Sequence, residues 1–279
     1  MGKTKSASSG TGKGGGGRGG GGKGSSSAAS SSAAFVVAPK GPPGPLLPSP
    51  PKLSRKRDLR AEEVGDNAWI VRGVLDRGEA SQMVDAADAR GYQHATSRGP
   101  RFGEAHRDHG RAGYEDPALA ASLWRDTGLD VAVAEAVGTI GGRSAVGLNP
   151  SLRVYRYTVG EVFGAHYDEA AVTPIGGTEL TLLCYLTGKR KNQKSNSSRE
   201  EWAEKDEERE GLEMNPGTVV GGETAFYRDA HDGARELFRV APEEGAVLIF
   251  RHGAVCLPHA SLAVVNGKKV VLRSDVAFR

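Results

Sequence analysis

The sequence of 279 residues has only two cysteines, Cys184 and Cys256, and both lie in apolar runs. Such a chain is not typical of a disulfide framework, and neither cysteine belongs to a zinc-binding motif. No run of 18 apolar residues occurs, so no membrane span is expected. The early apolar run AAFVVA at 33–38 is too short and too late for a secretory signal.

Acidic residues are absent from the first 57 positions, which hold ten lysines and arginines. The remainder has 27 basic against 34 acidic residues, a net charge of about −7. A folded part with this charge is not expected to bind a nucleic-acid backbone, for which a basic stripe is typical. We interpret the basic tail as a solvated tether, with contact to nucleic acid or an anionic surface as the alternative.

Glycine is concentrated at the start of the chain, with 12 of the 40 glycines in residues 1–24. A Ser/Ala run and a Pro-rich run follow, so residues 1–60 are predicted to be disordered and residues 61–279 to form the folded domain. We favour a cytoplasmic or nuclear location, and the basic run SRKR at 54–57 could serve as a nuclear signal. A myristoylation pattern in MGKTKS and an organelle transit peptide stay open.

A short strand is expected at the start of the predicted domain, within NAWIVRGVL at 67–75, and helical patterns follow before the main run of strand patterns. Helices are expected over 76–91 and 116–128, with a further helical stretch over 130–141. Strands are expected at 152–158, 163–168, 179–187, 222–227, 237–242, 245–252 and 268–278. This order predicts an α+β fold in which an antiparallel sandwich or barrel carries the functional site.

A charged segment, residues 188–215, interrupts the strand patterns. It is basic in its first part, acidic afterwards and almost without apolar residues. We interpret it as a solvated surface insertion. A lid over the site is the alternative, because long loops beside pockets are often functional.

The run GAHYDEAAV places His166 and Asp168 two residues apart, so in a strand both side chains point to one face. Alone, this pair also fits an ordinary polar strand face. His259 lies after a second strand pattern, and an antiparallel fold can bring it beside the pair. Two histidines and one carboxylate on one face of an octahedral ion leave the opposite face open, as in non-haem Fe(II) oxygenases.

Lys269 opens the last expected strand, where Val271, Arg273 and Asp275 share its face. A cation at the back of an apolar pocket suits a dicarboxylate that chelates the metal with its other end. A solvated strand charge is the alternative, and it fits Lys268 better than Lys269.

Five ordered blocks carry a family resemblance: LRVYRYTVGEVFGAHYD, ELTLLCYLT, GGETAFY, APEEGAVLIFRH and PHASLAVVNGKKVVLRSDVAFR. In order and spacing they resemble the 2-oxoglutarate and Fe(II)-dependent dioxygenases of the prolyl 4-hydroxylase-like group, over roughly residues 67–279. The resemblance implies a double-stranded β-helix (jelly-roll) core with supporting N-terminal helices. The sequence departs from the family pattern in one place: Ala260 and Ser261 follow His259 where many relatives have Glu-Gly. The contacts around that expected ligand, and the neighbouring substrate contacts, are therefore not implied by the resemblance.

The resemblance also implies roles for individual residues. His166, Asp168 and His259 would bind iron, and Lys269 would pair with the distal carboxylate of 2-oxoglutarate, with Arg273 as a second choice. The aromatic residues that would help hold this cosubstrate are Tyr157 and Tyr185, for which a core position is the equal alternative.

Several further residues have a structural interpretation. GGETAFY is read as a strand entered through two glycines, and His252 as a core residue or a neighbour of the site. Arg107 and Arg111 lie where relatives carry an arginine-containing loop near the pocket mouth, although surface salt bridges are the favoured role. His94, His106 and His109 have no informative spacing.

The function implied is hydroxylation of a C–H bond, with O2 as cosubstrate and ascorbate as reductant. A prolyl residue of a protein or peptide is the favoured substrate. The alternatives are a small molecule or another side chain, and a nucleic-acid base is disfavoured by the acidic domain. A non-catalytic binding module tethered by the basic tail is the second class of function, but all three expected metal ligands are present.

Overall fold

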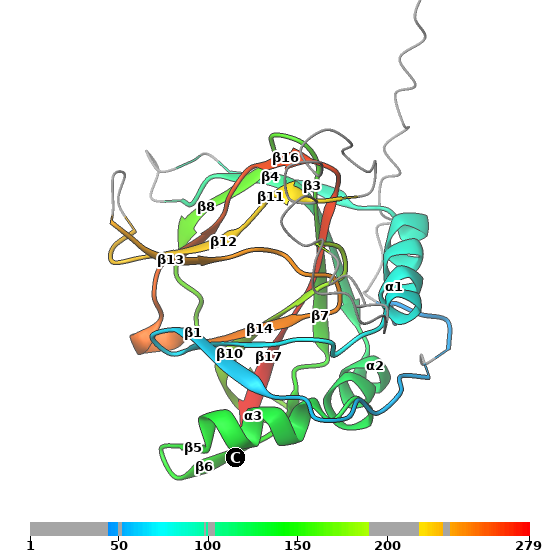
Figure 1. Cartoon of the computed structure of the whole chain (residues 1–279), viewed down its shortest axis with the longest axis vertical. Helices are drawn as coiled ribbons and strands as arrows, with labels where there is room; N and C mark the ends of the chain where they lie inside the picture. Colours follow the sequence, from blue (N-terminus) through cyan, green and yellow to red (C-terminus); the bar gives the residue numbers. More distant parts are fainter. Residues whose placement is uncertain (1–43, 50–51, 98, 100–103, 190–217, 231–234) are drawn as a thin grey trace, which may run out of the picture. The chain divides into compact units, whose positions relative to one another are not determined.

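The computed structural model describes residues 44–49, 52–97, 99, 104–189, 218–230 and 235–279 (Figure 1). The predictions for residues 1–43, and those for nearly all of the insertion at 188–215, lie outside these ranges. Within them, no helix combines the length and the apolar character needed to cross a bilayer.

Described residues before position 60 make packing and polar contacts with the rest of the fold. Leu46 and Leu53 are buried in the same apolar cluster as the helices and the sheet. The backbone N–H of Leu46 donates to Asp116 at 3.0 Å, and Lys56 pairs with Glu79 at 2.7 Å. Residues of this Pro-rich stretch therefore contact the folded part of the chain.

The supporting helices are α1 (Arg77–Arg90), α2 (Pro117–Ala121) and α3 (Leu129–Val137), with a π-helical turn at Ser122–Asp126. Helix α1 begins with a reciprocal capping box between Asp76 and Glu79 and ends at Gly91, where φ is 79°. The three predicted helical stretches are therefore confirmed, except that the third ends at Val137 and Thr139–Ile140 form a short strand. Figure 1 shows the helices on the outside of the strands.

The strands are short and numerous. Those of the large sheet are β1 (Ala61–Gly65), β2 (Ala68–Val71), β3 (Gln93–Thr96), β4 (Arg107–Glu115), β5 (Thr139–Ile140), β6 (Arg143–Leu148), β7 (Ser151–Tyr157), β8 (Val162–His166), β9 (Val172–Thr173), β10 (Gly176–Tyr185), β12 (Thr224–Tyr227), β13 (Glu236–Val240), β14 (Val247–Arg251), β15 (His259–Ser261) and β17 (Lys269–Phe278). A separate pair consists of β11 (Val220–Gly221) and β16 (Val264–Asn266).

The main path of the large sheet runs β1-β2-β14-β10-β17-β7-β4-β8-β15-β12-β13, and these pairings are antiparallel. The path curls round so that its first and last strands meet. The contact between them is made by Phe238 of β13, which lies against Gly65 of β1. A Cβ at Gly65 would collide with that ring, so glycine is needed there. The fold is a nearly closed double-stranded β-helix, as predicted.

Alternation along the central strands separates the core from the site. Leu152 and Val154 of β7 and Leu272 of β17 point outward into the cluster that packs under the helices. Tyr155 and Tyr157 of β7 belong to a different cluster, on the inner face. The helices therefore support the sheet from outside, while its inner face remains for polar and aromatic side chains.

Strand β4 was not predicted from the sequence. It pairs with β7 over Gly110–Glu115 and with β8 at Arg107 and Asp108, so it joins the two halves of the barrel. The sequence RDHGRAGYE places arginines and a histidine on one face where an apolar face is the usual sign of a strand. This strand face has no apolar pattern because it lines a cleft and does not pack against the core.

Candidate metal and cosubstrate site

Two paired strands and one loop bring together the three predicted metal ligands. His166 is the last residue of β8, and its Cα partner across the antiparallel pair is His259, the first residue of β15. Asp168 lies in the loop after β8, not on the strand as predicted. Its backbone N–H is 3.3 Å from the Cys256 sulfur, and its carbonyl accepts from Gly253 at 3.0 Å.

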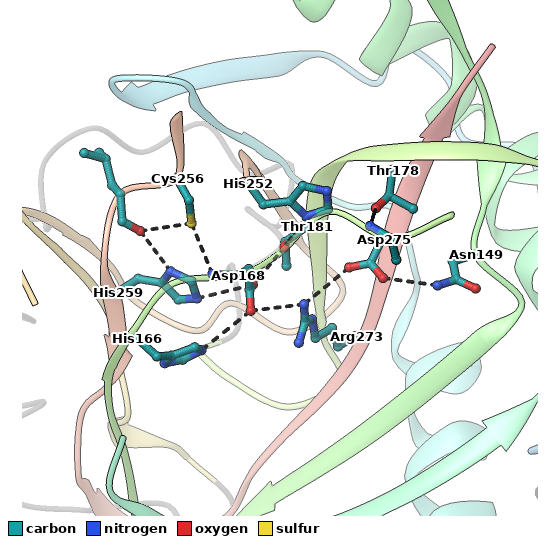
Figure 2. A network of polar contacts seen from close by, with 12 residues as sticks. Asn149, His166, Asp168, Thr178, Thr181, His252, Cys256, His259, Arg273 and Asp275 are labelled. Atoms are coloured by element: carbon teal, nitrogen blue, oxygen red, sulfur yellow. Dashed lines mark hydrogen bonds and ion pairs between the residues drawn. The ribbon is translucent and has the colours of Figure 1, made fainter. Parts of the chain in front are cut away.

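The ligand atoms of this triad all lie within 4.8 Å of one another (Figure 2). Asp168 Oδ1 is 3.7 Å from His166 Nε2, and Oδ2 is 3.4 Å from His259 Nε2. Adjacent ligands about 2.1 Å from an octahedral ion lie about 3 Å apart, so small movements would close this set around a metal. One carboxylate and two imidazoles form a donor set that suits Fe(II).

The imidazole rings are already oriented for metal binding. His166 Nδ1 lies 2.9 Å from the carbonyl of Gly164, and His259 Nδ1 lies 3.1 Å from the carbonyl of Leu257. A backbone acceptor at Nδ1 keeps the proton there, so Nε2 presents its lone pair to the site. Both Nε2 atoms face the Asp168 carboxylate, which is consistent with a shared ion.

The Asp168 carboxylate is held from several sides. Thr181 Oγ1 donates to its Oδ2 at 2.8 Å and also lies 3.1 Å from His252 Nδ1. Arg273 Nη2 is 3.1 Å from its Oδ1. Burial raises the pKa of Asp168, but His259 and Arg273 outweigh this effect and keep the pKa well below its usual range. Asp168 is therefore ionised, and His252 is buried beside the site, as the sequence suggested.

The two histidines differ in charge without a metal. Burial, followed by the charge of His259, lowers the pKa of His166 to about 3, so this ring is neutral. Burial also disfavours the charged form of His259, but its hydrogen bond to Asp168 is stronger and raises the pKa to about 9. A metal bound by both rings would displace the His259 proton.

Lys269 closes the other end of a pocket that begins at the triad. Its ammonium is buried and donates to the carbonyl of Gly222 at 2.6 Å and to Ser261 Oγ at 2.8 Å. It lies 5.1 Å from the ring centre of Tyr157 and 5.8 Å from that of Tyr185. Burial lowers the pKa of Lys269 to about 7. No carboxylate among the described residues forms a salt bridge with this ammonium.

The pocket between the metal triad and Lys269 contains two polar residues that sequence reasoning missed. Thr224 and Ser261 are opposite each other on β12 and β15, and both line this pocket. The hydroxyls of Tyr185 and Thr224 are 2.9 Å apart. Ser261 lies two residues after His259 and so shares its strand face, a signal that could have been used. Thr224 gave no such signal, because its place depends on strand pairing.

Arg273, the second choice as the cosubstrate anchor, lies at the metal end of the same pocket. Its guanidinium lies between Asp168 and Asp275, at 3.1 and 3.4 Å (Figure 2). Two carboxylates therefore already balance Arg273, whereas Lys269 has only neutral hydrogen-bond partners here. This difference favours Lys269 as the partner of a distal carboxylate.

A wider cleft of roughly 490 Å³ opens beside His166 and Asp168, and its walls include Arg107, Arg111 and His109 of β4. Arg107 lies 5.1 Å from the ring centre of Phe163. Within the described ranges, neither Arg107 nor Arg111 has the surface salt bridge predicted from the sequence. His109 is buried next to Tyr157, with the ring centres 4.9 Å apart, and burial lowers its pKa to about 4.

No protein-family model matches the chain, and no curated protein matches it. Among solved structures, the chain is similar to a viral collagen prolyl hydroxylase from Paramecium Bursaria Chlorella virus-1, at 16% identity and a TM-score of 0.46 over 76% of this chain and 96% of the other. A prolyl-4-hydroxylase from Pseudomonas putida gives 16% identity and 0.44 over 76% and 93%. A prolyl hydroxylase from Trichoplax adhaerens, in complex with a hypoxia inducible factor peptide, gives 14% and 0.47 over 76% and 84%.

Proposed function

We propose that this chain is a 2-oxoglutarate- and Fe(II)-dependent dioxygenase that hydroxylates a prolyl residue of a protein or peptide. The observation that carries the proposal is one pocket with two matched ends. A cluster of two imidazoles and one carboxylate lies at one end, and a buried ammonium lies at the other. A metal-chelating dicarboxylate would satisfy both ends at once.

The protein's own residues would bind and orient the reactants. His166, Asp168 and His259 would hold Fe(II), which when bound supplies the activation of O2 and the oxidative decarboxylation of 2-oxoglutarate to succinate and CO2. Lys269 would bind the distal carboxylate. Its hydrogen-bond partner Ser261 and the neighbouring Thr224 offer hydroxyls to the same carboxylate.

The walls of the pocket would keep water away from the reacting atoms. Tyr157, Tyr185 and Val271 are buried and line it. Because these side chains are apolar or have internal partners, they leave few sites for ordered water beside the cosubstrate. The choice of a prolyl substrate rests on the five ordered sequence blocks, and hydroxylation of a small molecule or another side chain by the same chemistry is the second candidate.

Succinate formation tests the chemistry. We expect the purified full-length chain to convert 2-oxoglutarate to succinate when supplied with Fe(II), ascorbate and O2. Replacing His166→Ala or Lys269→Met should reduce this turnover at least about tenfold, because each removes a charge-assisted or metal contact. Lys268→Met is the matched control, since Lys268 pairs with Asp88 outside the pocket and should keep the wild-type rate.

The proposal fails if the wild type forms no succinate, or if His166→Ala turns over as fast as the wild type. The prolyl substrate is tested separately by mass spectrometry of proline-containing peptides. A gain of one oxygen atom on a prolyl residue supports it, whereas a gain only on other residues or on a small molecule supports the second candidate.

A further inference from the structure

We infer that the substrate carries an anionic group, a carboxylate, which Arg111 and Arg153 bind at the mouth of the cleft beside the metal triad. This inference rests on the proposed function and deepens it by naming the charge of the substrate. It is carried by the placement of the two arginines and by the balance of charge around them.

Strand register places the arginines on the inner face of the barrel. Arg153 of β7 is the direct cross-strand partner of Arg273 of β17, and Arg111 of β4 is the partner of Tyr155, two residues along β7 from Arg153. Partners across a strand pair lie about 5 Å apart at Cβ and point to the same side. All three arginines line the cleft that has His166 and Asp168 among its walls.

The charges in this region do not balance. Arg273 is paired with Asp168 and Asp275, so its charge is satisfied within the protein. Across the described part of the chain, neither Arg111 nor Arg153 has a carboxylate partner or a side-chain hydrogen bond. Glu104 also lines the cleft and makes an interaction of its own.

Keeping these like charges together is unfavourable without a ligand. Like charges on directly opposed strand residues are destabilising. Arg111 is exposed at the cleft, and partial burial, followed by the positive charges of Arg153, Arg107 and Arg273, lowers its pKa. The proposed metal and cosubstrate would not relieve this repulsion, because two positive charges of Fe(II) and two negative charges of 2-oxoglutarate cancel.

A carboxylate on the substrate would relieve the repulsion. A guanidinium presents paired N–H donors that match a carboxylate in a bidentate pair, and a positive cleft attracts an anion as it approaches. The carboxylate has two possible sources: a glutamate or aspartate beside the target residue of a peptide, or the acid group of a small molecule.

Binding to matched probes tests the inference. The full-length protein, with Fe(II) and 2-oxoglutarate but without oxygen, is titrated calorimetrically with two pairs of probes. The first pair is a blocked peptide of alternating glutamate and proline and its glutamine counterpart. The second pair is N-acetylproline and its amide. We expect the acidic member of at least one pair to bind about tenfold more tightly, the effect of one charge-assisted contact.

Variants and salt locate the effect. The preference for the acidic probe should shrink several-fold in Arg111→Gln and in Arg153→Gln, and it should persist in Arg77→Gln, which removes an equal charge on α1 outside the cleft. The salt dependence is measured on the wild type, so that no substitution can affect folding. The preference for the acidic probe should decrease as added salt screens the charges. A preference confined to one probe pair identifies the peptide or the small acid as the source.

Equal affinities within both pairs, including no measurable binding by any probe, would overturn the inference. A preference that survives unchanged in the Arg111→Gln/Arg153→Gln double variant would overturn it as well. Succinate formation separates this result from the proposed function. Turnover without acid preference removes only the arginine site, whereas acid preference without turnover keeps that site and removes the dioxygenase.

Discussion

Lys269 is the residue on which the cosubstrate proposal depends most. Its buried ammonium has two neutral hydrogen-bond partners, and burial lowers its pKa to about 7 from 10.5. Between these two pH values the folded protein binds fewer protons than the unfolded chain, so its stability rises with pH in this window. A bound carboxylate would favour the charged form and raise the pKa again.

Proton uptake should therefore accompany 2-oxoglutarate binding. At pH 8 the free protein holds mostly neutral Lys269, and binding the dicarboxylate should take up about one proton. Apparent affinity should be nearly constant below pH 7 and fall above it, approaching about tenfold per pH unit. Calorimetry in buffers of different ionisation enthalpy measures the uptake.

A Lys269→Arg variant is the control for that titration, because arginine keeps its charge at every accessible pH. Any binding that it retains should occur without proton uptake. Uptake of the same size in Lys269→Arg would assign the proton to another group and contradict the role given to Lys269.

Gly222 is a second residue with a testable role. Its φ is +69°, its carbonyl accepts from Lys269, and an added Cβ would lie 3.0 Å from Lys269 Cδ. Gly222→Ala should weaken 2-oxoglutarate binding about tenfold or more, because the lysine must shift. Gly44→Ala, at a position with open space, is the control for titrations of 2-oxoglutarate. Unchanged affinity in Gly222→Ala would show that this turn does not position Lys269.

Residue patterns allowed part of the site to be predicted. The spacing of His166 and Asp168, with His259 after a later strand, was enough to predict that the three side chains lie together. The structure places them in one cluster. Thr224 could not be predicted, because it enters the pocket through the pairing of β12 with β15. That pairing joins distant segments of the chain and cannot be predicted from local sequence.

At the scale of elements, helix α1 fixes the N-terminal segment to the barrel. Glu79 closes the capping box with Asp76 and also accepts from Ser54 and Lys56, at 2.9 and 2.7 Å. Helix α1 could be predicted from the sequence because its pattern is local. Strand β4 could not, since its cleft-facing side chains are charged where a core-facing strand would be apolar.

Replacing this capping residue should destabilise the fold. Glu79→Ala is expected to lower the free energy of unfolding by about 1–3 kcal/mol, because it removes a cap contact and the ion pair with Lys56 and leaves the backbone N–H of Ser54 without its acceptor. Urea unfolding measures the change. Glu135→Ala, on helix α3, is the comparison and should change the free energy by about 0.5 kcal/mol or less. A similar change in the free energy of unfolding for both variants would show that Glu79 does not anchor the N-terminal segment.

At the scale of the whole molecule, the first described residues show what composition alone does not reveal. Leu46 and Leu53 are buried in the main apolar cluster, although they lie in a Pro-rich stretch without periodicity. Isolated apolar anchors of this kind cannot be told from a linker by composition. The overall architecture was predictable, because helices followed by many short strands leave few antiparallel arrangements.

Two truncations test where the fold begins. A chain lacking residues 1–60 should melt several degrees below a chain lacking residues 1–43, because the longer deletion uncovers the surface that Leu46 and Leu53 cover. Calorimetry or circular dichroism measures both melting temperatures. Equal temperatures would mean that residues 44–60 contribute nothing to stability.

The central claim is that His166, Asp168, His259 and Lys269 support oxidative decarboxylation of 2-oxoglutarate. It is tested most directly by running the reaction under O2 enriched in the heavy oxygen isotope and examining the succinate by mass spectrometry. The account predicts succinate that carries one heavy oxygen atom, formed by the wild type and by Lys268→Met but not by His259→Ala. Succinate without the label, or labelled succinate from His259→Ala at the wild-type rate, would contradict it.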